Sequence, residues 1–242
     1  MTEWTTIQTW PYKRFQQYGQ MWRRWIPPDG SAPIEAAESA IIGCRASICY
    51  GASIAFGARI NVEARIGDGA SIGYRAIIGY RTNIGDRASV GNEASIGYWV
   101  SIGDEASIGN EASIRDKASI GDKASISDRA NIGYQASIGC WASIGDGAII
   151  GDRANIGDGA SIGRGDIWRC IGPLGSGGRT LTVTSGANGI WCYTGCFAGP
   201  AEEFLAAVES KHGDSTLARG YKAALTFAEE QFRLDKEATD DE

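Results

Sequence analysis

His212 is the only histidine in this 242-residue chain. Histidine has the side chain whose ordinary pKa lies nearest to neutral pH, so it is the usual general base in group-transfer reactions. His212 falls in a His212-Gly213-Asp214 segment that reads as a turn between two helices, where a structural role is the simpler interpretation. It is the one candidate catalytic residue that the sequence offers.

A row of aspartates recurs at intervals of 18 residues, or at a multiple of 18. Carboxylates stacked about one strand spacing apart could bind cations. Each could instead cap a turn by accepting a backbone hydrogen bond, with Arg87 and Lys123 nearby, and we favour this interpretation. The row consists of Asp68, Asp86, Asp104, Asp122 and Asp158, with Cys140 in the gap.

The six cysteines include two close pairs, Cys44/Cys49 and Cys192/Cys196. Neither pair has the two-residue spacing that is common in zinc sites. On an extended strand Cys192 and Cys196 would lie about 13 Å apart, which is too far for a disulfide. The sequence therefore predicts no metal site and places this second pair in the core of a hairpin.

A six-residue repeat positions most of these side chains. An isoleucine stands at every sixth position from Ile42 to Ile162, with Val90 as the one exception, and alanine stands two residues earlier in nineteen of the twenty-one hexads. Alternate strand residues face the same way, so we expect the isoleucine and alanine inside and the residue between them outside. Glycine follows the isoleucine in sixteen hexads, and we expect it to form a sharp bend with positive φ.

The hexads resemble those of the bacterial hexapeptide-repeat family, and Ile84-Gly-Asp-Arg-Ala-Ser89 matches that motif position by position. The resemblance implies an all-β solenoid, a left-handed parallel β-helix with three hexads per coil and about seven coils over residues 40–167. It also implies a homotrimer, and an acyltransferase that uses acyl-CoA or an acyl carrier protein. Departures weaken the enzyme expectation, because His212 lies outside the coils and no loop interrupts them to shape a substrate pocket.

Sorting the hexads at a period of 18 predicts what each face of the helix carries. One face should carry an unbroken outward serine ladder, and a second face with its adjoining corner should carry exposed isoleucines and aromatic rings. Exposed apolar patches usually mark an interface, so we expect the trimer contact there, although the rings could simply pack on their own coil corners. The predicted interface is Ile77, Tyr80, Tyr98, Trp99, Tyr134 and Ile149; the ladder is Ser53, Ser71, Ser89, Ser107, Ser125, Ser143 and Ser161.

Residues 1–39 are expected to form an N-terminal cap or anchor. Phe15, Tyr18, Trp22 and Trp25 fit one face of a short helix that Pro27-Pro28 would terminate. Such a helix could cover the first coil, or it could attach the protein to a larger assembly. The candidate anchor residues are Trp4, Trp10, Phe15, Trp22 and Trp25.

Residues 168–242 are expected to form a C-terminal α+β cap with an acidic tail. Strands over 181–184 and 190–197 would make a hairpin. One helix should begin at Pro200 and a second near Thr216. This unit resembles the caps of uncharacterised bacterial and phage hexapeptide-repeat proteins, a likeness that implies no known chemistry.

The composition excludes several functions. The net charge is −6 and no basic stripe is present, which argues against a nucleic-acid partner. No long apolar run suggests a membrane span and no apolar signal core begins the chain, so we expect a cytoplasmic protein or part of an assembly formed there.

Three functions remain open from the sequence. The first is a non-catalytic structural or adhesive trimer, such as a spacer, decoration or attachment component, including one associated with a phage. The second is an acyltransferase with an atypical site and an acyl-CoA cofactor. The third is a surface binder that uses the serine ladder to recognise ice or a polysaccharide.

Overall fold

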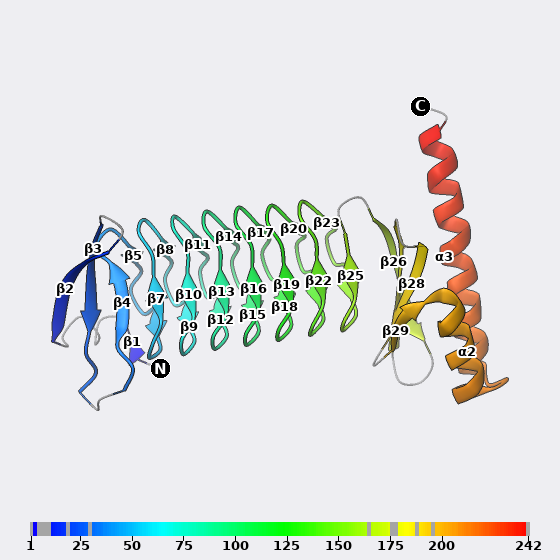
Figure 1. Ribbon diagram of the computed structural model, residues 1–242, viewed down its shortest axis with the longest axis horizontal. Helices are drawn as coiled ribbons and strands as arrows, with labels where there is room; N and C mark the ends of the chain where they lie inside the picture. Colours follow the sequence, from blue (N-terminus) through cyan, green and yellow to red (C-terminus); the bar gives the residue numbers. More distant parts are fainter. Residues whose placement is uncertain are drawn as a thin grey trace.

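The computed structural model describes residues 2–3, 11–17, 20–28, 31–163, 166–174, 179–186, 189–194 and 197–240. The chain forms a rod of parallel coils, flanked by a hairpin at the N-terminal end (Figure 1). A small antiparallel sheet and two helices lie at the C-terminal end of the rod.

The coils build three parallel sheets, which we call A, B and C. Seven two-residue strands enter each sheet, one from every coil, so the structure confirms the expected seven coils. Sheet A contains β6 (Ser47–Ile48), β9 (Arg65–Ile66), β12 (Asn83–Ile84), β15 (Ser101–Ile102), β18 (Ser119–Ile120), β21 (Ser137–Ile138) and β24 (Asn155–Ile156). Sheet B contains β7 (Ser53–Ile54), β10 (Ser71–Ile72), β13 (Ser89–Val90), β16 (Ser107–Ile108), β19 (Ser125–Ile126), β22 (Ser143–Ile144) and β25 (Ser161–Ile162). Sheet C contains β5 (Ile41–Ile42), β8 (Arg59–Ile60), β11 (Ile77–Ile78), β14 (Ser95–Ile96), β17 (Ser113–Ile114), β20 (Asn131–Ile132) and β23 (Ile149–Ile150).

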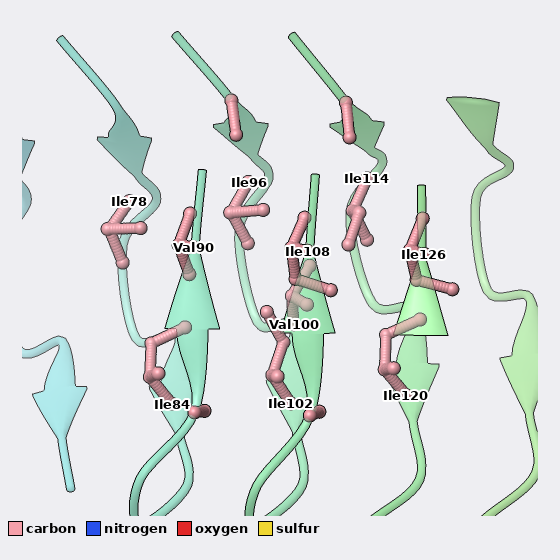
Figure 2. Packing of buried hydrophobic residues seen from close by; sticks show 14 of the residues in the cluster. Ile78, Ile84, Val90, Ile96, Val100, Ile102, Ile108, Ile114, Ile120 and Ile126 are labelled. Atoms are coloured by element: carbon pink, nitrogen blue, oxygen red, sulfur yellow. The ribbon is translucent and has the colours of Figure 1, made fainter. Parts of the chain in front are cut away.

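The repeated isoleucines and alanines fill the interior of the rod, as the hexad pattern predicts. Strands one coil apart pair in parallel and in register, so each isoleucine lies on the isoleucine of the neighbouring coil, or on Val90 in sheet B. Figure 2 shows these stacks, for example Ile84, Ile102 and Ile120 along sheet A. Almost all of these side chains are fully buried, so the core is continuous along the rod.

The glycine that follows the isoleucine in most hexads has a different role from the expected one. Positive φ occurs two residues later, at non-glycine positions such as Arg81 (φ 56°) and Trp99 (φ 60°). At Gly79 the glycine allows a close approach of the next coil, because a Cβ there would lie 2.1 Å from the carbonyl oxygen of Gly97. The expectation of a left-handed glycine here was therefore wrong.

The expected N-terminal aromatic helix is also wrong. Residues 12–17 and 20–25 form antiparallel strands β2 (Tyr12–Gln17) and β3 (Gln20–Trp25), and β4 (Ile34–Ala37) connects them to β7. This hairpin extends sheet B beyond its first coil and satisfies the backbone groups of an otherwise open edge. A further strand, β1 (Thr2–Glu3), pairs with β6 at the same end of sheet A.

The C-terminal cap contains the predicted hairpin within a larger sheet, which we call sheet D. Its strands are β26 (Ile167–Leu174), β27 (Arg179–Gly186), β28 (Gly189–Thr194) and β29 (Phe197–Pro200), followed by helices α2 (Ala201–His212) and α3 (Thr216–Asp240). Tyr193 on sheet D belongs to the core of the coils, whereas Leu181 and Val183 pack with the helices. Sheet D therefore lies between the last coil and the two helices.

Candidate functional site

His212 lies at the end of α2 and remains within the cap. Its ring centroid is 6.3 Å from that of Tyr221, and both side chains line a cavity of about 250 Å³. Thr194, Phe197, Phe204, Ala207, Val208 and Lys211 complete the lining. This cavity is built from the cap and includes no side chain of the coils, so within one chain His212 is not placed over a coil.

The aspartates of the row hold adjacent coils together. The Oδ1 atom of Asp86 accepts a hydrogen bond from the backbone N–H of Asp68 at 2.8 Å, and Asp104 accepts one in the same way from Asp86. Asp158 accepts from the backbone N–H of Cys140, also at 2.8 Å. These contacts support the turn-capping interpretation over the cation ladder.

The serine ladder occupies the outward face of sheet B. Its serines pair in register from coil to coil, for example Ser71 with Ser89 and Ser107 with Ser125. All but Ser53 are exposed. The ladder is thus a flat hydroxyl surface, and its N-terminal end continues onto the β2–β4 extension, where Glu35 pairs with Ser53.

The predicted interface residues fall into three groups rather than one patch. Ile77 and Ile149 lie on the outward face of sheet C, where Ile41 joins them; their exposed fractions are 41%, 71% and 60%. They are the three outward-facing isoleucines among the coil strands. Sheet C therefore differs from the serine face in carrying exposed apolar side chains.

The corner tyrosines form the second group. Tyr80 donates its hydroxyl hydrogen bond to Glu63 at 3.3 Å, and Tyr134 accepts one from the Lys117 ammonium at 3.1 Å. Both rings are half-buried against the corners of neighbouring coils, whereas Tyr98 is exposed. Tyr80 and Tyr134 therefore pack on the corners of the coils, which is the alternative to an interface that the sequence left open.

Trp99 is the third group, and it leans toward sheet A instead of sheet C. It lines an open hollow of about 920 Å³, which we call the sheet A hollow. Arg81 covers one part of its ring, with the guanidinium carbon 4.7 Å from the centroid. The other residues lining the hollow are Arg45, Ser47, Glu63, Arg65 and Asn83.

Sequence reasoning missed Arg65 and Asn83. The signal was present at the period of 18, because these two stand at outward positions of sheet A where Ser47, Ser101 and Ser119 carry serine. The sequence alone did not indicate that the corner side chains Arg81 and Trp99 lie over these same positions of sheet A.

The predicted anchor residues are divided between the core and the surface. Trp22 and Trp25 are 8% and 4% exposed, and Trp25 belongs to the core of the coils. Phe15 stacks on Trp22 with ring centroids 6.3 Å apart. Trp4, Trp10 and Tyr18 lie outside the described residues.

The cysteines of the described residues form no disulfide with one another. Those in the described part of the chain, Cys44, Cys49, Cys140, Cys170 and Cys192, are free thiols, while Cys196 lies outside it. Burial raises the pKa of the Cys192 thiol to about 12, so this group stays protonated near neutral pH. No metal-binding group of three or more acidic, cysteine or histidine side chains occurs among the residues the structure describes.

Comparison with known families decides the identity of the coils. A family model described as the GMPPB C-terminal domain matches residues 76–168, all but six of which lie within the seven coils. The coil segment is a hexapeptide-repeat domain. Together with the three parallel sheets, this match gives the coils over residues 41–162 the fold of a hexapeptide-repeat β-helix.

Several solved structures resemble the hexapeptide-repeat domain. A UDP-N-acetylglucosamine acyltransferase from Francisella novicida is 19% identical, with a TM-score of 0.49, and the match covers 53% of this chain and 58% of that one. PerB from Caulobacter crescentus, solved with CoA and GDP-perosamine, is 18% identical with a TM-score of 0.32 and 55% of each chain covered. The acetyltransferase domain of PglB from Neisseria gonorrhoeae is 21% identical with a TM-score of 0.28, covering 50% of this chain and 55% of that one.

This chain spans little more than half the length of those three proteins. Identities at this level concern the fold and assign no activity to the present chain. A search of curated proteins finds no match. Among the described residues, neither helix has the length and apolar character needed to cross a membrane.

Proposed function

We propose that this protein is a non-catalytic structural or adhesive homotrimer, which serves as a spacer, decoration or attachment component of a larger assembly, such as a phage particle. The observation that carries the proposal is the placement of Ile41, Ile77 and Ile149 on one outward face of the rod. Exposed isoleucines on a single face are stabilised by burial against another surface. Copies related by a threefold axis parallel to the rods would bring the same coils, and hence the same isoleucines, to the same height.

Substituting two of these isoleucines with glutamate tests the interface. We expect the wild-type protein to elute with the mass of three chains in light-scattering chromatography. The Ile77→Glu/Ile149→Glu variant should elute as a monomer, because six carboxylates would have to be buried in each trimer.

The serine face of the same two coils supplies the matched control. Ser71→Glu/Ser143→Glu places equal charge on sheet B and should leave the trimer intact. A monomeric wild-type protein, or a trimer that survives the sheet C substitutions, would show that this face is not the subunit contact.

Acetyl-CoA distinguishes the proposed role from the acyltransferase alternative. A ligand present at about a hundred times its dissociation constant stabilises a protein by about 2.7 kcal/mol, which raises the melting temperature by several degrees. We expect no shift with millimolar acetyl-CoA, since His212 lies in the cap among Phe204, Val208 and Tyr221. A clear shift that disappears in His212→Ala would overturn the non-catalytic assignment.

A further inference from the structure

The sheet A hollow carries an excess of positive charge. Its lining includes Arg45, Arg65 and Arg81, and one carboxylate, Glu63. A hydrogen bond from Arg81 holds the pKa of Glu63 below its ordinary value, so this carboxylate is ionised near neutral pH. With three guanidinium groups against one carboxylate, the lining has a net charge of +2.

Glu63 leaves one of the three arginines without a counter-charge. It forms ion pairs with Arg81 and with Arg45, the latter at 3.5 Å, and also accepts the Tyr80 hydroxyl. Arg65 stands on the outward face of β9 and is exposed; within the described part of the chain its side chain has no ion pair or hydrogen bond. The planar guanidinium of Arg65 is therefore free to bind an anionic group through two parallel hydrogen bonds.

Trp99 gives the same hollow a flat apolar wall. Its side chain is 51% exposed although Arg81 stacks on the ring and the edge of Tyr80 contacts it, with ring planes at 83°. These two neighbours fix the ring, so presenting it to a ligand requires little reordering. An indole held in this way suits the apolar face of a sugar ring.

Polar side chains complete a surface suited to hydroxyl groups. Ser47 and Asn83 lie on either side of Arg65 along sheet A, one coil away in each direction. Beyond Asn83 the outward positions continue as Ser101, Ser119, Ser137 and Asn155, so a chain of sugars could follow the row toward the cap.

The backbone around the hollow disfavours a nucleotide phosphate. Phosphate cradles depend on free backbone N–H groups. Here the N–H groups of Glu63, Arg65 and Arg81 are all donated to carbonyl oxygens of adjacent coils. Recognition of an anion must therefore come from side chains, and a single free guanidinium matches a single carboxylate better than a diphosphate.

We propose that the sheet A hollow binds an acidic oligosaccharide, with Arg65 pairing with a uronic acid carboxylate and Trp99 stacking on a sugar ring. Ser47 and Asn83 would hydrogen-bond to the sugar hydroxyls. This inference does not rest on the proposed trimer, because Arg65 faces away from sheet C. If the protein is an attachment component, the sheet A hollow would be the site at which it binds a polysaccharide.

Calorimetric titration with oligogalacturonate tests the proposal on the full-length protein. We expect Arg65→Gln to weaken binding by about tenfold or more, since a charge-assisted hydrogen bond contributes at least that factor. Trp99→Ala removes the stacking face and should weaken binding by about two- to tenfold. The matched controls are Arg87→Gln and Trp141→Ala, whose wild-type side chains are an exposed arginine and an exposed tryptophan at corners on the other side of sheet A. Both controls should bind like the wild type.

Further ligands define what would overturn the assignment. A neutral cello-oligosaccharide should bind weakly, a sulfated oligosaccharide should bind less tightly than the uronate, and UDP should not compete. Absence of oligogalacturonate binding, equal binding in Arg65→Gln, tighter binding of the sulfated chain, or competition by UDP would each refute the proposal. Light scattering on every variant separates a loss of binding from a loss of assembly.

Discussion

Replacing Trp25 with alanine should lower the free energy of unfolding by about 3–5 kcal/mol, the cost of removing a large aromatic side chain from a packed core. Trp25 is 4% exposed and belongs to the same buried cluster as the coil isoleucines. It pairs with Ile34 across β3 and β4, and its ring lies 6.0 Å from that of Tyr12. The substitution would open the N-terminal end of the core to water.

Trp141 provides the comparison for this experiment. It is 65% exposed at a corner of the coils, so Trp141→Ala should change stability by no more than about 0.5 kcal/mol. Guanidinium denaturation of both variants, read by circular dichroism, gives the two free energies. Equal effects for Trp25 and Trp141 would show that the hairpin is not a structural part of the solenoid.

Burial of Trp22 and Trp25 bears on how the N-terminal segment works. Trp25 belongs to the same buried cluster as the coil isoleucines, which agrees with the cap interpretation of the sequence, and Trp22 is buried in the hairpin that extends sheet B. A solenoid needs such a cover because its terminal coil has no neighbour to bury its open end. Deletion of residues 1–26 should therefore destabilise the protein, because it removes Trp25 from the core.

The N-terminal aromatic residues show why the sequence alone misassigned this element. Phe15 and Trp22 fit one face of a helix, but they are also cross-strand partners in the hairpin, as are Tyr12 and Trp25. Local spacing is compatible with both arrangements. The open edge of sheet B decides between them, because a hairpin can pair with that edge and a helix cannot.

The coils could be predicted because their period recurs without a slip. Parallel in-register stacking follows from the hexads alone, as do the serine ladder and the outward isoleucines. The corners could not be predicted so well. The direction of Trp99 depends on the positive φ of a corner residue, and this conformation was expected at the preceding glycine. The positive φ lies at Trp99 itself, two residues after Gly97 where it was expected. The Trp99 ring accordingly lies over sheet A, whereas the sequence pattern placed it beside sheet C.

The sequence alone did not predict strand β26 because it contains residues that usually end a strand. Its sequence, Ile-Trp-Arg-Cys-Ile-Gly-Pro-Leu, contains a Gly-Pro pair that usually ends a strand. The register with β27 shifts between Ile171 and Leu174, so an irregularity accommodates the pair. A tertiary partner was needed to reveal this strand.

Ile102→Ala should lower the free energy of unfolding by about 2–5 kcal/mol, because it leaves a cavity in the middle of the rod. Ile102 is fully buried between Ile84 and Ile120 (Figure 2). Three coils lie on each side of β15 and hold its backbone in place, so collapse around the cavity is restricted. Ile42, in the first coil and only partly buried, supplies the matched control, and Ile42→Ala should cost clearly less.

Hydrogen exchange measured residue by residue distinguishes a local weakness from a global one. A solenoid is stabilised by contacts between neighbouring coils, so Ile102→Ala should reduce amide protection first in β12, β15 and β18. Protection in β6 and β24 should fall much less, because those strands lie several coils away. A uniform loss along the whole rod would mean that the seven coils unfold as one cooperative unit, and the position of a cavity would then not matter.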